Sequence, residues 1–277
     1  MVPRRTVADL VFTTFKNRSD AIVLADEVSR QLHHEGYTTA VRLLDDDAEL
    51  APTIDATTLV VSLGGDGTFL KSARLAHAHG ARILAVNLGR LGFLLSVPSS
   101  EVLDDVRRAL VAPSTVERLA LEIVLPNDGS GQFALNEVVV ERASVGHMVR
   151  VRCYVDDEEF LTYSADGVLV ASPTGSTGYN FSAGGPVVDR ELSVMVLTPI
   201  APHFTIDRSI VVSGQRTIRL VSQSRGAVVV ADGRSIGSLA AGESVLVRPS
   251  AEPVRVEDSH RYRLGDRLRE GLREGHA

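Results

Sequence analysis

An unbroken apolar run that ends in a glycine-rich turn constrains the fold of this chain more than any other stretch. Residues 59–63 (LVVSL) are apolar at four of five positions, as expected of a parallel strand that is buried on both faces. The pentapeptide GGDGT at 64–68 follows directly, and its three glycines allow a sharp turn with φ above 0°. The sequence therefore predicts a buried strand, a tight turn and a helix over 68–79 in succession.

The GGDGT turn has the composition of a phosphate-binding loop as well as that of an ordinary turn. Backbone N–H groups at the start of a helix point outward, and the helix dipole favours an anion there. Asp66 stands in the middle, where a carboxylate can ligate a cation, orient a hydroxyl or take its proton, as phosphoryl transfer requires. Composition alone also suits a strand-to-helix turn with an Asx cap. The chain has no P-loop and no G-x-G-x-x-G after a strand, so those two nucleotide fingerprints are excluded.

Strand and helix patterns alternate over the first 112 residues. The expected strands are 7–14, 38–44, 59–63 and 82–86, and the expected helices are 18–35, 68–79 and 99–112, the last capped by Ser99 or Ser100. Gly36 and Gly80 follow the first two helices, as C-terminal glycines do. This alternation predicts an α/β N-terminal domain with a Rossmann-like parallel sheet. The stretch NLGRLGFL at 87–94 follows the fourth strand, and it is either a linker or a second loop on the ligand-binding edge of the sheet.

The second half of the chain has a different pattern. Short alternating or apolar runs occupy 118–125, 132–142, 148–155, 159–164, 167–171, 209–212, 217–222, 227–231 and 244–249, and turn residues stand at 127–131, 156–158 and 232–233. This pattern predicts a predominantly β C-terminal domain of the β-sandwich type. We expect one domain over 1–112 and another over 113–254. Residues 255–277 are polar and partly helix-like, and we expect them to fold back on the first domain.

Composition excludes several classes of protein. The net charge of −6 argues against a nucleic-acid partner, and no apolar run approaches the ~18 residues of a membrane span. The N-terminus lacks the pattern of a signal peptide, so we expect a cytoplasmic protein with no membrane partner. Cys153 is the only cysteine, which excludes an internal disulfide, and its place in an alternating run predicts a buried, inert thiol.

The segment DGVLVASPTGSTGYNFSAGGP at 166–186 is the most informative of the second half. An apolar strand runs into a loop rich in Gly, Ser and Thr, whose amides and hydroxyls suit an anion. Tyr179 offers a flat apolar face for a base. Composition alone would suit a flexible loop, but the apolar strand before it and Pro186 followed by two valines after it favour an ordered one. The sequence GSTG at 175–178 is not G-x-S-x-G, which excludes a serine hydrolase of that type.

Taken together, these motifs make the chain similar to bacterial-type NAD kinases over nearly its whole length. They are GGDGT at 64–68, NLGRLGFL at 87–94, Asn136-Glu137, the segment 166–186, LTPI at 197–200 and Pro202-His203. The resemblance implies transfer of the γ-phosphoryl group of ATP, or a phosphoryl group of polyphosphate, to the 2′-hydroxyl of the adenosine ribose of NAD, giving NADP. It also implies Mg²⁺ or another divalent cation with ATP, and a homodimer or homotetramer.

The same resemblance assigns roles to individual residues. Asp66 would be the catalytic proton acceptor, Gly67 part of the same nucleotide contact, and Lys71 a phosphate contact. Asn136 and Glu137 would hold ribose hydroxyls, although these residue types alone favour a solvated strand edge. The other dinucleotide contacts would be His147, Asp166, Thr177, Gly178, Tyr179, Asn180, Phe181 and Ser182, with Tyr179 stacking on a base. No residue is expected to bind a metal directly.

Two departures and two rival functions accompany this interpretation. Gly178 stands where the family usually has Ala, which should loosen the loop, because Gly costs more entropy to order. Residues 204–209 (FTIDRS) diverge from the family pattern in a segment that contributes to subunit contacts in family members. Lipid and sugar kinases that share GGDGT form one alternative class, and a catalytically silent dinucleotide sensor forms the other.

Overall fold

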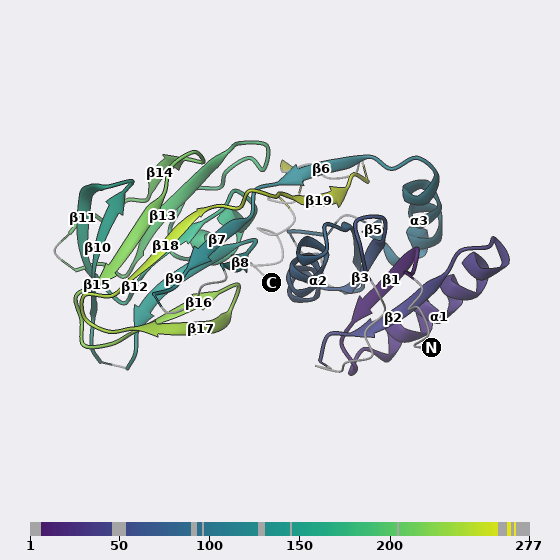
Figure 1. Ribbon diagram of the computed structural model, residues 1–277, viewed down its shortest axis with the longest axis horizontal. Helices are drawn as coiled ribbons and strands as arrows, with labels where there is room; N and C mark the ends of the chain where they lie inside the picture. Colours follow the sequence, from purple (N-terminus) through teal and green to yellow (C-terminus); the bar gives the residue numbers. More distant parts are fainter. Residues whose placement is uncertain are drawn as a thin grey trace, which may run out of the picture. The chain divides into compact units, whose positions relative to one another are not determined.

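The structure is a computed structural model that describes residues 7–45, 54–89, 93–95, 97–126, 131–144, 146–203 and 205–259, together with 265, 266 and 269. The chain divides into two compact units, shown in Figure 1. One comprises Met1–Glu117 and Val254–Ala277, and the other comprises Arg118–Pro253.

The first unit is built on a sheet that contains seven strands among the described residues, in the order β2-β1-β3-β4-β19-β6, with β5 beside β4. Its elements are β1 Leu10–Thr14, α1 Ser19–His34, β2 Thr39–Leu43, β3 Leu59–Gly64, α2 Asp66–Ala78, β4 Arg82–Asn87, β5 Val97–Pro98, the 3₁₀ turn η1 Ser99–Glu101, α3 Val102–Val111, β6 Thr115–Arg118 and β19 Val254–Glu257. The pairings from β2 through β1, β3 and β4 to β19 are parallel. The expected α/β class is confirmed.

Helices cover both faces of this sheet (Figure 1). α1 and α3 share a hydrophobic core with one face of β1, β3 and β4, while α2 contacts β1, β3 and β4 from the other side. In α1 the buried residues Ala21, Ala25, Val28 and Leu32 recur at helical spacing, which is why this segment folds as a helix on the sheet. Gly36 after α1 and Gly80 after α2 have φ of 91° and 64°, so both helix ends were correctly predicted.

Three local expectations differ from the structure. Residues Ser99–Glu101 form a 3₁₀ turn, and α3 begins at Val102 after Glu101, without a side-chain cap hydrogen bond, so the expected serine cap is wrong. α2 begins at Asp66 rather than at residue 68. The strand β19 was not predicted; it forms because alternate residues Val254 and Val256 are buried beside β4.

The second unit consists of two sheets, each with six strands among the described residues. One has the order β11-β10-β15-β18-β7-β8, and the other has the order β14-β13-β12-β9-β16-β17. The strands are β7 Leu121–Val124, β8 Gln132–Ala134, β9 Glu137–Arg142, β10 Val149–Val155, β11 Glu158–Ala165, β12 Gly167–Ala171, β13 Val194–Ile200, β14 Ile210–Ser213, β15 Ile218–Ser222, β16 Ala227–Ala231, β17 Arg234–Leu239 and β18 Ser244–Pro249. Two short helices, η2 Thr174–Thr177 and α4 Tyr179–Ser182, follow β12.

The two sheets of this unit share one core. Inward residues of both sheets, among them Val151, Tyr163, Val168 and Val229, form a single buried cluster, which confirms the expected antiparallel β domain. Cys153 is fully buried in this cluster, and burial raises the pKa of its thiol to about 12, as its place in an alternating run predicted. None of the described helices is both long and apolar enough to cross a membrane.

Candidate active site

The GGDGT turn is shaped by lack of space rather than by a left-handed backbone. A Cβ on Gly64 would lie 2.2 Å from Oγ1 of Thr68, so only glycine fits where β3 meets α2. Gly64, Gly65 and Gly67 all lack a positive φ, and the expectation of a left-handed turn there is wrong. Because α2 begins at Asp66, this carboxylate lies in the first helical turn, where the helix dipole stabilises negative charge.

The carboxylate of Asp66 joins the two glycine-containing loops of the first unit. It accepts the backbone N–H of Phe93 at 3.1 Å and that of Leu94 at 3.2 Å. Asp66 is half-buried, and the loop that supplies the two N–H groups follows β4, the neighbour of β3 in the sheet. Residues 87–89, 93 and 94 of this stretch therefore belong to this edge of the sheet, and residues 90–92 lie outside the described residues.

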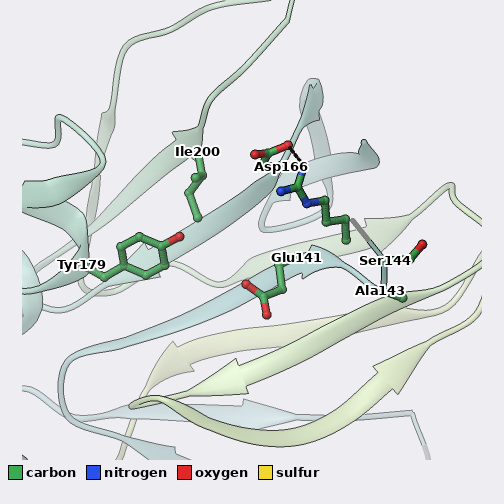
Figure 2. A pocket seen from close by; sticks show the side chains of 7 residues that line it. Glu141, Ala143, Ser144, Asp166, Tyr179 and Ile200 are labelled. Atoms are coloured by element: carbon green, nitrogen blue, oxygen red, sulfur yellow. Dashed lines mark hydrogen bonds and ion pairs between the residues drawn. The ribbon is translucent and has the colours of Figure 1, made fainter. Parts of the chain in front are cut away.

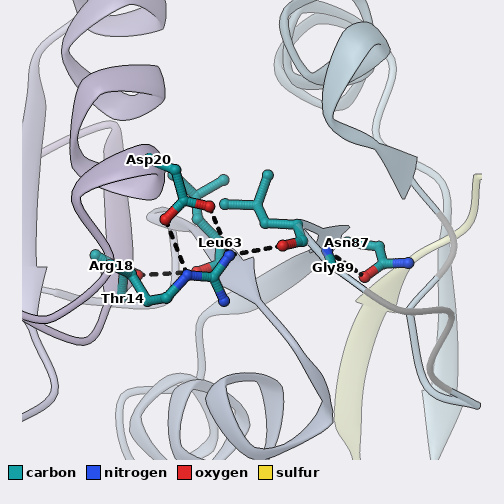
Figure 3. Close-up of polar contacts among 7 residues, drawn as sticks. Thr14, Arg18, Asp20, Leu63, Asn87 and Gly89 are labelled. Atoms are coloured by element: carbon teal, nitrogen blue, oxygen red, sulfur yellow. Dashed lines mark hydrogen bonds and ion pairs between the residues drawn. The ribbon is translucent and has the colours of Figure 1, made fainter.

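Arg18 holds the beginning of the second loop, as Figure 3 shows. Its Nη2 donates to the carbonyl oxygen of Leu88 at 2.6 Å, while Nε and Nη2 donate to the carboxylate of Asp20 at 2.9 and 2.7 Å. The hydrogen bond from Arg18 lowers the pKa of Asp20 to about 2. The sequence analysis did not select Arg18; an Arg-x-Asp at the start of a helix was the only signal for it.

Lys71 does not share these contacts. Its ammonium lies 4.7 Å from the ring centroid of Phe15, and it lines a cavity of about 440 Å³ together with Arg42 and Arg74. Gly67 is exposed near the start of α2.

In the second unit, Asn136 and Glu137 lie where the chain passes from one sheet to the other: Asn136 directly precedes β9, and Glu137 is its first residue. The Oδ1 of Asn136 and the Oε2 of Glu137 are buried and have no hydrogen-bond partner among the described residues. A buried polar atom without a partner costs about 1–3 kcal/mol, so two such acceptors on adjacent residues indicate a place for donor groups of a ligand. A pair of hydroxyls has the required chemistry.

Glu137 is only 7% exposed, and its environment opposes its ionisation. Burial is the larger cause and the negative charge of Asp232 the smaller one; together they raise the pKa of Glu137 to about 7, although a hydrogen bond from the backbone N–H of Tyr179 acts in the opposite direction. A carboxyl group that titrates near neutrality is typical of a functional site.

The loop that follows β12 is ordered and tightly packed, as predicted, but it forms the short helices η2 and α4. A Cβ on Gly175 would lie 2.1 Å from the backbone oxygen of Asn136. The side chain of Asn180 is buried; it donates to the carbonyl oxygens of Ser176 and Pro186 and accepts from Thr198. The amide group of Asn180 therefore holds the loop together.

Tyr179 connects this loop to a cavity of about 300 Å³. Figure 2 shows Tyr179, Asp166, Ile200 and Glu141 pointing toward a common space. Arg142 borders the same cavity and pairs with Asp166, with Nη1 2.5 Å from Oδ1. Burial and the neighbouring carboxylates raise the pKa of Tyr179.

The structure thus brings together some of the predicted residues and leaves others apart. Glu137, Tyr179 and Asp166 are linked through the Tyr179 backbone and the cavity. Thr177 and Gly178 belong to the same loop, and a Cβ on Gly178 would lie 3.4 Å from Asn136 Nδ2 and from Glu137 Oε2. His147, Phe181 and Ser182 are exposed and do not line this cavity. The sequence analysis missed Glu141 and Arg142, whose only signal was their position on the strand that Glu137 begins.

Within the described part of the chain, no three or more His, Cys, Asp or Glu side chains are grouped so that they could hold a metal ion. Asp66 is a single carboxylate at the glycine turn. Mg²⁺ commonly binds through one or two carboxylates together with phosphate oxygens of a nucleotide. The residues present therefore fit a cation that arrives with a nucleotide better than a resident one.

Both halves of the chain match known proteins. The ATP-NAD kinase N-terminal domain matches residues 27–112, and the ATP-NAD kinase C-terminal domain matches residues 135–257. The NAD kinase of Heliobacterium modesticaldum is 43% identical over 238 residues, which cover 82% of each chain, and that of Moorella thermoacetica is 39% identical over 78% of this chain and 71% of its own.

Solved structures give the same result. The crystal structure of an NAD kinase from Archaeoglobus fulgidus in complex with ATP superposes with a TM-score of 0.74, at 28% identity over 94% of this chain and 98% of that one. The fold is also that of a yeast NADH kinase complexed with NADH, with a TM-score of 0.78 at 23% identity over 96% and 87% of the two chains. The fold and the family models define a two-domain nucleotide kinase, and the relatives refine this class. The chain belongs to the NAD kinase family.

Proposed function

We propose that this chain transfers the γ-phosphoryl group of ATP to the 2′-hydroxyl of the adenosine ribose of NAD, giving NADP. The observation that carries the proposal is the pair of buried, unpartnered acceptors on Asn136 and Glu137. A ribose presents two neighbouring hydroxyls, and each can donate to one of these oxygens. The ligand would thereby satisfy groups that are costly to leave unpaired.

The neighbouring cavity supports the adenosine half of the dinucleotide as the group bound there. Tyr179 offers its ring as a stacking face, and its backbone N–H favours the ionised form of the Glu137 carboxyl. The base and the ribose would therefore be bound next to each other. Asp166 and Arg142 supply charged groups of both signs at the cavity wall for the polar part of the ligand.

We assign proton acceptance to Asp66. A ribose hydroxyl is a weak acid, and a positioned carboxylate that takes its proton contributes about 10²–10⁴-fold to the rate. The two N–H groups of Phe93 and Leu94 fix the orientation of this carboxylate. A divalent cation bound with ATP, for which we propose Mg²⁺, would neutralise charge on the phosphates. Lys71 lies beside Arg42 and Arg74 and is assigned a phosphate contact on the strength of the family resemblance alone.

The test is incubation of the purified protein with ATP, MgCl₂ and NAD, followed by an enzymatic assay specific for NADP. We expect NADP that depends on all three components. Phosphorylation of a lipid or sugar without NADP would favour the alternative kinase class, and tight NAD binding without product would favour a dinucleotide sensor. Replacing ATP by polyphosphate, and NAD by NADH, defines the donor and acceptor range.

Location and assembly follow from the resemblance alone. We propose that the protein acts in the cytoplasm as a homodimer or homotetramer. Sedimentation of the purified protein tests the assembly directly, and variants in the divergent segment 204–209 test whether that segment contributes to a subunit interface.

A further inference from the structure

The backbone at the sheet-to-sheet crossing is held by a residue from a distant hairpin. β8 pairs with β7 in one sheet, and β9 pairs with β12 and β16 in the other, so the chain changes sheets at Leu135 and Asn136. The carboxylate of Asp232 accepts three successive N–H groups there, those of Leu135 at 2.8 Å, Asn136 at 2.8 Å and Glu137 at 3.2 Å.

Asp232 is itself fixed by its hairpin. It lies between β16 and β17 with φ of 46°, and the next residue, Gly233, has φ of 74°. A two-residue hairpin turn with both φ values positive favours Asp-Gly or Asn-Gly. The backbone N–H of Asp232 also donates to the carbonyl oxygen of Glu137 at 3.1 Å, so backbone and side chain engage the same segment.

The carbonyl groups of the crossing are held from the opposite direction. Ser172 donates from Oγ to the carbonyl oxygen of Leu135 at 2.5 Å and from its N–H to that of Asn136 at 2.8 Å. The backbone from which the Asn136 and Glu137 side chains extend is thus bonded on both sides. These are the side chains that carry the unpartnered acceptor atoms.

We propose that Asp232 is a positioning residue for the dinucleotide site: by binding three consecutive N–H groups, its carboxylate fixes the directions in which Asn136 and Glu137 present their acceptors to the ribose hydroxyls. The inference rests on the proposed function, because it takes these two residues as the ribose contacts. Preorganised groups lose less entropy on binding, so loosening them raises the dissociation constant without removing a contact.

The test compares Asp232→Asn with Asp156→Asn. Asp156 is a close match in the same unit: it is a half-buried hairpin aspartate with φ of 56°, it accepts the N–H of Thr217 at 3.0 Å, and its own N–H donates to the Thr217 carbonyl oxygen. Asn tolerates a positive φ, so both variants keep their turns. We expect the dissociation constant for NAD, measured by calorimetry, to rise about tenfold or more in Asp232→Asn, as loss of a charge-assisted hydrogen bond predicts, and to stay near the wild-type value in Asp156→Asn.

Two further measurements separate positioning from a general effect on folding. In a chain that already carries Asn136→Ala and Glu137→Ala, Asp232→Asn should add little to the loss of NAD affinity, because Asp232 acts through those residues. The groups that act on the Glu137 carboxyl are the Asp232 charge and the Tyr179 N–H. The titration seen in the pH dependence of NAD binding should therefore move to lower pH in Asp232→Asn and stay in place in Asp156→Asn.

The outcomes are distinct. If the wild-type protein neither binds NAD nor forms NADP, the proposed function fails, whatever the variants do. If the wild type binds NAD and the two Asn variants are equal in affinity, the inference about Asp232 is wrong. It is also wrong if the loss is fully additive in the triple variant, or if Asp232→Asn loses its cooperative unfolding transition while Asp156→Asn keeps it.

Discussion

The carboxylate of Asp66 accepts the backbone N–H of Phe93 at 3.1 Å, and this contact joins the loop after β3 to the loop after β4. Parallel strands that lie side by side end at the same edge of the sheet, and the loops that follow them meet there. The carboxylate is therefore oriented by main-chain donors of its own unit before any substrate is bound.

Replacing Asp66 by Asn should remove turnover and leave NAD binding in place. The amide cannot take the proton of a ribose hydroxyl, and the lost contribution of a general base is about 10²–10⁴-fold in kcat. Measurement of kcat and of the NAD dissociation constant tests this separation. Asp55→Asn is the control, because Asp55 also accepts a backbone N–H, that of Thr57 at 2.8 Å, outside the site. An Asp66→Asn variant with near-normal kcat would refute the assignment of Asp66 as the base.

The sequence predicted four strands of the first sheet, β1 to β4, and its three helices, because the strands are apolar runs and the helices have a clear period. It did not predict β5, β6 and β19 as strands of this sheet. The position of Asp66 in a glycine turn was equally visible. The reason for a glycine at position 64 could not be predicted. Glycine is needed there because the Thr68 side chain packs against it, and the sequence pattern does not show this contact. The hydrogen bond from Arg18 to the Leu88 carbonyl oxygen joins residues that are 70 positions apart. It could not be predicted from the sequence, because it depends on how the strands pair in the sheet.

In the second unit, the motifs led to the proposed site residues but did not show how those residues are supported. Asn136 and Glu137 were selected through the family resemblance, since their types alone suit a solvated strand edge. The sequence predicted one continuous strand over 132–142, whereas the structure has two strands, β8 and β9, in different sheets. Nothing in the local alternation of residues marks this change of sheet. Asp232, which supports this backbone, is 95 positions beyond Glu137 in the sequence. From the sequence alone, Asp232 and Gly233 had only the pattern of an ordinary hairpin turn.

Arg18→Ala should loosen the second glycine loop. We expect a clear loss of kcat and only a small loss in the free energy of unfolding. The variant loses the hydrogen bond to the Leu88 carbonyl oxygen. Leu88 lies in the same loop as Phe93 and Leu94, whose N–H groups contact Asp66. A hydrogen bond of this kind contributes about 1 kcal/mol to stability. Arg107→Ala is the matched control, because Arg107 pairs with Glu35 on the surface of the same unit, where ion pairs contribute little to stability. Equal kcat values in the two variants would show that Arg18 has no part in orienting the loop.

Glu137→Gln should change how stability depends on pH. The pKa of Glu137 is about 7 in the folded protein, above the 4.5 that is usual for a glutamate, so the folded state holds this proton more tightly than the unfolded state. Its stabilising effect is fully present below pH 4.5 and is lost as the pH rises through 7. Across that window the free energy of unfolding of the wild type should fall relative to Glu137→Gln by roughly 3 kcal/mol, at about 1.4 kcal/mol per pKa unit.

Urea unfolding at a series of pH values checks this prediction, and Glu122→Gln is the control of opposite sign. The hydrogen bond from Arg248 lowers the pKa of Glu122, so its stabilising effect is present above its unfolded pKa and is lost as the pH falls. If the difference between the wild type and Glu137→Gln is the same at pH 4.5 and pH 8, Glu137 does not titrate between them in the folded protein.

Gly175→Ala and Gly178→Ala should differ sharply, although the two glycines are three residues apart. A Cβ at 175 would lie 2.1 Å from the backbone oxygen of Asn136, and neither β9 nor η2 can move away without breaking the hydrogen bonds of Ser172. We expect a loss of about 1–3 kcal/mol in the free energy of unfolding, with weaker NAD binding, as for other overpacked sites.

A Cβ at 178 would meet its nearest neighbours at 3.3–3.4 Å, and the NAD kinases that this chain resembles usually carry Ala there. Gly178→Ala should therefore alter the free energy of unfolding by less than about 1 kcal/mol and keep NAD affinity. Urea unfolding and calorimetric titration with NAD measure both effects, and comparable losses in the two variants would mean that the packing of η2 against Asn136 does not control the site.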